Sequence, residues 1–140
     1  MTRLALLCSA VLLTVLAVAC ANAKAPAQAD LLHRRFVLAT VDGDPFPAMN
    51  PPDIEFNEGF RVSGRICNRY TGLGTLENGV LTVGQMATTK MLCPDDTLNR
   101  FETMFAAMLA AGVKVDLEDD RLRLSQGGHV LVFTARDWVR

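Results

Sequence analysis

The chain has 140 residues, of which 50% are hydrophobic and 6% aromatic, a length that allows one domain and little more. Its formal net charge of −1 at pH 7 gives no bulk attraction to nucleic acid or to an anionic membrane surface. Aromatic residues are too sparse, and too rarely interleaved with basic ones, for a platform on which nucleic-acid bases could stack.

Residues 1–19 have the features of a secretory signal peptide. Arg3 lies in a short positive region, and an apolar run follows that ends in "LAVAC" at Cys20. Small residues before a cysteine favour signal peptidase II, so we expect a lipid anchor on Cys20 and, in a cell with two membranes, an outer-membrane lipoprotein that faces the periplasm. Two alternatives stay open: cleavage at Ala21-Asn22-Ala23 to a soluble periplasmic protein, or retention of the segment as an anchor.

The stretch after Cys20 is rich in alanine and, up to residue 30, contains no bulky apolar residue. Such a composition cannot contribute to a core, so residues 20–31 are interpreted as a lipidated cysteine and a flexible tether. The folded domain is expected over residues 32–140.

The first half of that domain has extended patterns separated by turn residues. Residues 36–41 form an apolar run typical of a buried strand, and residues 42–52 are a proline-rich loop. Asn57-Glu58-Gly59 and Asn78-Gly79 each lie between alternating residues, which predicts two hairpins. Residues 85–93 are expected to be extended.

The hydrophobic period changes after Pro94. Apolar residues recur at helical spacing at Leu98, Phe101, Phe105, Met108 and Leu109. Asp95, Asp96 or Thr97 can cap the first turn, and Gly112 suits a left-handed helix end. One amphipathic helix is therefore predicted over about residues 96–111, with its apolar face on the sheet.

Two alternating runs and a nearly continuous apolar run at residues 130–134 follow from Val113, separated by turns at residues 118–120 and 126–128. Strands joined by short turns are antiparallel. The predicted fold class is α+β and mainly β: an antiparallel β roll or partly closed barrel, with one amphipathic helix over an open face.

The sequence contains no recognisable catalytic or metal-binding motif. His33 and His129 are isolated, and neither belongs to a zinc-type spacing. We therefore expect no metal, no cofactor and no enzymatic activity. A Cys67 nucleophile with His129 as its base, or another site that is assembled only in three dimensions, remains as the alternative.

Cys67 and Cys93 are the only thiols left once Cys8 is removed with the leader and Cys20 carries lipid. Their even number and the oxidising compartment predict a disulfide between them. Two buried, reduced cysteines that act as small hydrophobic side chains are the alternative.

Several passages of the domain resemble the META domain family, and within it the HslJ-like envelope proteins. They are "HRRFVLATVDGDP", "PPDIEF", "VSGRICNRYTGLGTLENGVLTVG" and "MATTKMLC", in this order. The resemblance implies a small antiparallel β fold with a helix and a link to heat and envelope stress. It implies no enzymatic activity.

The segment from Arg65 to Gly74 contains the most characteristic of these residues. We expect Gly72 and Gly74 to allow turns, Asn68 to satisfy turn backbone groups, and Tyr70 to bury its ring while its hydroxyl stays hydrogen-bonded. Alternatively, Arg65, Asn68, Arg69 and Tyr70 form a recognition surface.

The expected function is that of a non-enzymatic envelope lipoprotein that supports stress tolerance by binding another envelope component. A small binding or inhibitor module in the periplasm is the alternative.

Overall fold

The computed structural model describes residues 25–136. The signal peptide, the lipid on Cys20 and the competing cleavage site at Ala21-Asn22-Ala23 concern residues outside this range, so they stay predictions. Within residues 25–136, no helix has the length and the apolar character that crossing a membrane requires.

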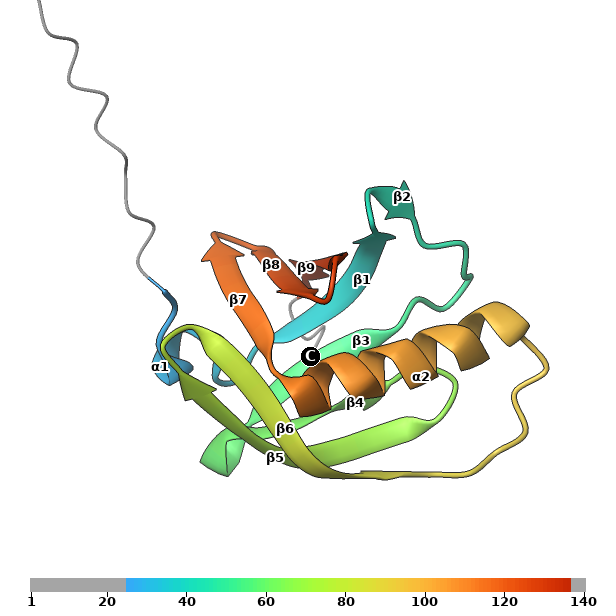
Figure 1. Cartoon of the computed structure of the whole chain (residues 1–140), viewed down its shortest axis with the longest axis horizontal. Helices are drawn as coiled ribbons and strands as arrows, with labels where there is room; N and C mark the ends of the chain where they lie inside the picture. Colours follow the sequence, from blue (N-terminus) through green and yellow to red (C-terminus); the bar gives the residue numbers. More distant parts are fainter. Residues whose placement is uncertain (1–24, 137–140) are drawn as a thin grey trace, which may run out of the picture.

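The described chain is dominated by strands (Figure 1). In chain order the elements are α1 (Gln28–Leu31), β1 (Arg35–Val41), β2 (Asp44–Pro45), β3 (Asp53–Asn57), the 3-10 turn η1 (Glu58–Phe60), β4 (Arg61–Arg65), β5 (Arg69–Glu77), β6 (Val80–Thr88), α2 (Asp96–Ala111), β7 (Val113–Glu118), β8 (Arg121–Gln126) and β9 (His129–Ala135).

The strands form one antiparallel sheet that closes into a barrel. Their order is β2-β1-β3-β4-β5-β6-β7-β8-β9, and β1 also pairs with β9. Because β2 is only a two-residue extension of β1, the closed barrel has eight strands. The predicted class, mainly β with one main helix, is confirmed. The sequence predicted a roll or a partly closed barrel, and the β1–β9 pairing shows that the barrel is fully closed.

Turn residues in the sequence explain where the hairpins lie. At the β5–β6 turn, Asn78 has φ 50° and Gly79 has φ 74°, the two positive values that a type I′ hairpin requires. At the β3–β4 turn, Gly59 has φ 65°. The predicted positions of both hairpins are therefore confirmed.

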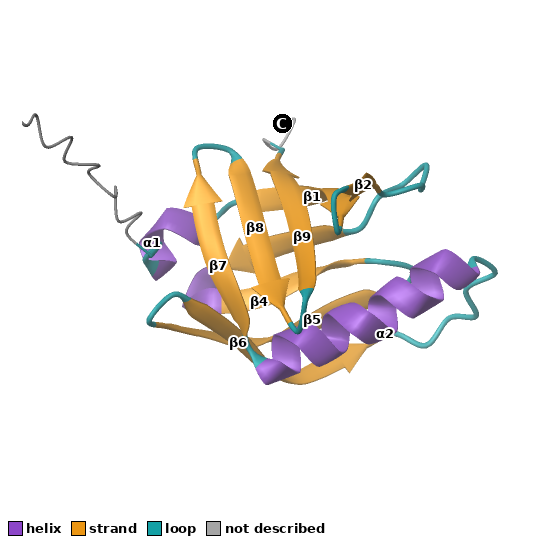
Figure 2. Ribbon diagram, turned by 45° about the horizontal axis from the view of Figure 1, so that its top comes forward, coloured by secondary structure: helices purple, strands orange, loops and turns teal. Residues whose placement is uncertain are grey.

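Helix α2 covers the place where the barrel wall is weakest. β6 and β7 pair only at Val80–Lys114 and Leu81–Val113, and α2 lies against β6 beyond these pairs (Figure 2). Asp95 caps the helix by accepting hydrogen bonds from the N–H groups of residues 97 and 98. The predicted bounds of 96–111 are confirmed.

The apolar face of α2 completes the core. Its buried residues are Phe101, Phe105, Met108 and Leu109, whereas Leu98 is only partly buried. The Phe105 ring contacts Tyr70 of β5 and Phe133 of β9 at centroid distances of 5.8 and 6.1 Å. The barrel interior is therefore filled by side chains, as in other small eight-stranded barrels.

The expected turns at Gly72 and Gly74 are wrong, because both residues lie inside β5. A Cβ atom at Gly72 would lie 2.6 Å from Val83 Cγ1, and one at Gly74 would lie 2.9 Å from Val62 Cγ2. These glycines are therefore needed for close packing against neighbouring side chains and not for a turn.

The expected end of the tether at residue 31 also needs correction. Gln28–Leu31 forms α1, and the Leu31 side chain is fully buried in the core. The ordered domain begins at least one helical turn earlier than the composition indicated, since a single leucine anchors a segment that is otherwise polar or small.

Candidate functional site

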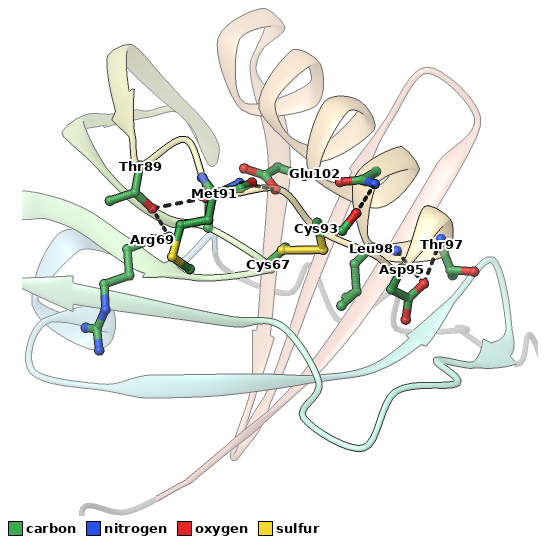
Figure 3. Close-up of a disulfide and its surroundings, with 11 residues drawn as sticks. Cys67, Arg69, Thr89, Met91, Cys93, Asp95, Thr97, Leu98 and Glu102 are labelled. Atoms are coloured by element: carbon green, nitrogen blue, oxygen red, sulfur yellow. Dashed lines mark hydrogen bonds between the residues drawn. A yellow bond between two sulfur atoms is a disulfide. The ribbon is translucent and has the colours of Figure 1, made fainter.

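The turn between β4 and β5 is fixed by the predicted disulfide (Figure 3). Cys67 is bonded to Cys93, with a Cα–Cα distance of 6.0 Å, within the normal range for a bridge. β4 ends at Arg65, so Cys67 lies in the turn that follows the strand. The bond joins this turn to the segment that leads into α2.

Asn68 strengthens the same connection through its side chain. Its Oδ1 accepts hydrogen bonds from the Met91 N–H at 2.7 Å and from the Thr89 hydroxyl at 3.2 Å. Its Nδ2 donates to the Met91 carbonyl and to Glu102, each at 3.4 Å. Asn68 therefore satisfies the backbone of a distant segment rather than that of its own turn.

Tyr70 is also committed to the fold. Its ring is buried, and its hydroxyl donates a hydrogen bond of 2.8 Å to the Asp53 carbonyl. Burial raises the pKa of the Tyr70 hydroxyl well above its usual value, so the group remains a donor at physiological pH. In the expected recognition surface, the side chains of Asn68 and Tyr70 are therefore buried, although Tyr70 still lines part of the hollow described below.

Arg65 and Arg69 are the two residues of that prediction whose side chains lie outside. They face each other as the last pair of the β4–β5 ladder, and both are exposed. They border a hollow of about 760 Å³ on the outer wall of the barrel. Its lining comes from Arg35, Asp53, Glu55, Ser63, Gly64, Arg65, Arg69, Tyr70, Thr71, Ala87, Thr88 and Thr89.

The floor of the hollow follows from strand register. Glu55 of β3, Ser63 of β4, Thr71 of β5 and Ala87 of β6 are consecutive cross-strand partners, so they form one row across the sheet. Three of these four side chains are small. The long arginine side chains therefore rise around a low floor, and a depression forms on a surface that would otherwise be convex.

Asp53 organises the charges beneath the hollow. Its carboxylate is buried and forms an ion pair with Arg35, and its Oδ1 accepts the Arg65 N–H at 2.7 Å. Arg35 also lies 3.3 Å from Glu55 Oε1. Burial, and then the nearby Asp53 charge, raise the pKa of Glu55. Both carboxylates of the lining therefore contact Arg35, while Arg65 and Arg69 remain at the rim.

The residues of the alternative catalytic pair have other partners. Cys67 is in the disulfide, while His129 Nδ1 lies 2.9 Å from Asp42 Oδ2. His33 Nε2 lies 3.4 Å from Glu58. Among residues 25–136, no group of three or more His, Cys, Asp or Glu side chains is arranged to hold a metal ion.

The sequence did not predict the hollow, although the alternating pattern of two strands indicated some of its lining residues. Alternation places Ser63 and Arg65 on one face of β4, and it places Arg69 and Thr71 on one face of β5. The sequence did not show that the two faces adjoin, because the turn at residues 66–68 was not placed.

Comparisons with known proteins agree on one family and one fold. The META domain family model matches residues 29–138. Heat shock protein HslJ of Escherichia coli (strain K12) is 40% identical over 108 residues, which cover 76% of this chain and 77% of HslJ.

Two solved structures have similar folds. The first, titled "NMR structure of the protein", has a TM-score of 0.71 and 38% identity, and the match covers 78% of this chain and 94% of that chain. A second NMR structure, of a protein from Burkholderia xenovorans, has a TM-score of 0.64 and 22% identity, and covers 81% and 87%. At this lower identity the likeness concerns the fold alone.

Proposed function

Because the chain belongs to the META domain family and is a homologue of a heat shock protein, we propose that it supports tolerance of heat and envelope stress. In this proposal it is a lipoprotein of the outer membrane that faces the periplasm. It acts without enzymatic activity, by binding another component of the cell envelope. The leader and Cys20 motivate the location, and the relative named for heat shock motivates the stress role.

The hollow on the outer wall of the barrel is the observation that carries the binding role. Small barrels that bind ligands often hold them inside, but here buried side chains such as Phe36, Phe56, Phe105 and Phe133 fill the interior. The hollow of about 760 Å³ is of the size usual for small-molecule sites, roughly 300–1,000 Å³. The outer face of β3–β6 is therefore the proposed binding surface.

A blocking substitution tests this role without assuming any particular ligand. Thr71 lies in the floor of the hollow, so Thr71→Trp fills it with a bulky ring and leaves every charge in place. Ser125→Trp is the matched control, because Ser125 is also a half-buried, small outward residue but belongs to β8. Each variant is expressed in a strain that lacks the gene, and survival is measured after heat shock.

Deletion of the gene should lower survival. The wild-type protein and Ser125→Trp should restore it, whereas Thr71→Trp should not, with thermal unfolding confirming that both variants fold. Normal survival of the deletion strain would reject the stress role. Full rescue by Thr71→Trp would reject the hollow as the binding surface.

A further inference from the structure

Strand register separates Arg65 and Arg69 from other outward arginines of the barrel. On β8, Arg121 lies opposite Glu118, and Arg123 lies opposite Asp116. Opposite charges at directly facing positions stabilise a sheet, whereas like charges there destabilise it. In contrast, Arg65 of β4 lies directly opposite Arg69 of β5.

The nearby carboxylates form no ion pair with Arg65 or Arg69, although the Arg69 charge acts on Glu55 and partly offsets the rise that burial causes in the pKa of that carboxyl. Asp53 and Glu55 form ion pairs with Arg35, and the remaining Asp53 oxygen accepts the backbone N–H of Arg65. Within residues 25–136, the side chains of Arg65 and Arg69 form no ion pair and no side-chain hydrogen bond. Two like charges thus lie on directly paired residues, an arrangement that a bound anion would stabilise.

The hollow beside the arginine pair provides neutral polar groups. Ser63 Oγ accepts a hydrogen bond of 2.9 Å from Asn57 Nδ2, so its own hydroxyl hydrogen is available to a ligand. Thr71 and Thr88, which also line the hollow, add two more hydroxyl groups. Hydroxyl groups both donate and accept hydrogen bonds, which suits a ligand that carries hydroxyl groups of its own. The volume of about 760 Å³ exceeds the needs of a single inorganic ion.

We propose that the hollow binds a small hydroxylated molecule through a phosphate or carboxylate group held between Arg65 and Arg69. Guanidinium groups match the planar and bidentate geometry of such oxyanions. The ligand's hydroxyl groups lie over the floor at Ser63 and Thr71. This inference deepens the proposed binding function and rests on it, because it assigns a ligand class to the same surface.

Calorimetric titration of the full-length protein, purified from the envelope, tests the ligand class with four probes. They are glucose 6-phosphate, glucuronate, glucose and inorganic phosphate. The two anionic sugars differ in their oxyanion, so the tighter of them identifies the preferred group. We expect at least one of them to bind more tightly than both glucose and inorganic phosphate, and we expect its affinity to fall as salt is added.

Single substitutions then assign the binding to the arginine pair. Arg65→Gln and Arg69→Gln should each weaken the anionic sugar by about tenfold or more, the usual effect of losing a charge-assisted hydrogen bond. Arg123→Gln is the matched control, because it removes the same charge from β8 and should leave the affinity unchanged.

Three results would overturn the inference. The first is that neither anionic sugar binds. The second is that glucose or inorganic phosphate binds as tightly as the anionic sugars do. The third is that Arg123→Gln loses as much affinity as Arg65→Gln and Arg69→Gln. None of these results would alter the outcome of the Thr71→Trp survival test, which does not depend on ligand charge. Failure of the ligand class can therefore be told apart from failure of the proposed function.

Discussion

Removal of the Cys67–Cys93 disulfide gives the most quantitative test of the fold around the site. The bond joins residues 26 positions apart, and the chain-entropy relation for a loop of that length gives a stabilisation of about 3.5 kcal/mol at 25 °C. Single domains have a net stability of roughly 5–15 kcal/mol. Cys67→Ala with Cys93→Ala should therefore remove between about one fifth and about 70% of the free energy of unfolding.

The loss should arise mainly in the unfolded chain. In the folded protein, Asn68 still holds Met91 and Thr89 through three hydrogen bonds, so the two segments should stay together without the bond. The unfolded chain, by contrast, gains freedom and exposes more surface. The dependence of the unfolding free energy on urea concentration should therefore become steeper in the double variant.

Urea unfolding followed by circular dichroism measures both quantities. The wild-type protein treated with a reductant that opens the bond is the control, because it retains both sulfur atoms. It should lose nearly as much stability as the alanine variant. Asn68→Ala should lower the free energy of unfolding more in the disulfide variant than in the wild-type protein. The reason is that the disulfide and the Asn68 hydrogen bonds hold the same segment. A loss below about 1 kcal/mol in the double variant would refute the chain-entropy reasoning.

Three further predictions concern the core, the sheet and the N-terminus. Phe105→Ala should lower the free energy of unfolding by roughly 3–5 kcal/mol, because Phe105 is buried between α2 and the barrel; a loss below about 1 kcal/mol in urea would contradict its place in the core. Gly72→Ala should cost about 1–3 kcal/mol through its clash with Val83, whereas Gly84→Ala, which has nothing within 4 Å of its Cβ, should be nearly neutral in the same assay. Cys20 should carry a diacylglyceryl group in the mass spectrum of the native protein, and an unmodified N-terminus between residues 21 and 25 would reject the lipoprotein prediction.

The sequence by itself determined the elements whose signals are local. Asn78-Gly79 fixes a hairpin because both residues tolerate positive φ. The helix of residues 96–111 follows from apolar spacing, from a capping aspartate and from Gly112. These signals act within a few residues, so no knowledge of distant partners is needed. The disulfide was also predictable, since few cysteines remained to pair.

Features that depend on distant partners were decided only by the tertiary structure. The barrel closes because β1 pairs with β9 at the other end of the domain, a contact that no local pattern specifies. The Asn68 side chain points inward because residues 89–91 lie beside it. Its neighbours in sequence had instead predicted that it would bond to the backbone of its own turn. Gly72 is required because β6 brings Val83 against it, next to an irregularity in register where Gln85 has φ 45°.

The candidate site shows the same division. The sequence supplied Arg65 and Arg69 as candidates together with two residues that proved to be buried. Only the register of β3, β4, β5 and β6 placed small side chains in one row beneath the two arginines. A shift of one residue in strand pairing moves every side chain to the opposite face. Alternation within each strand therefore could not show which outward residues would meet, and pairing in the folded barrel decided it.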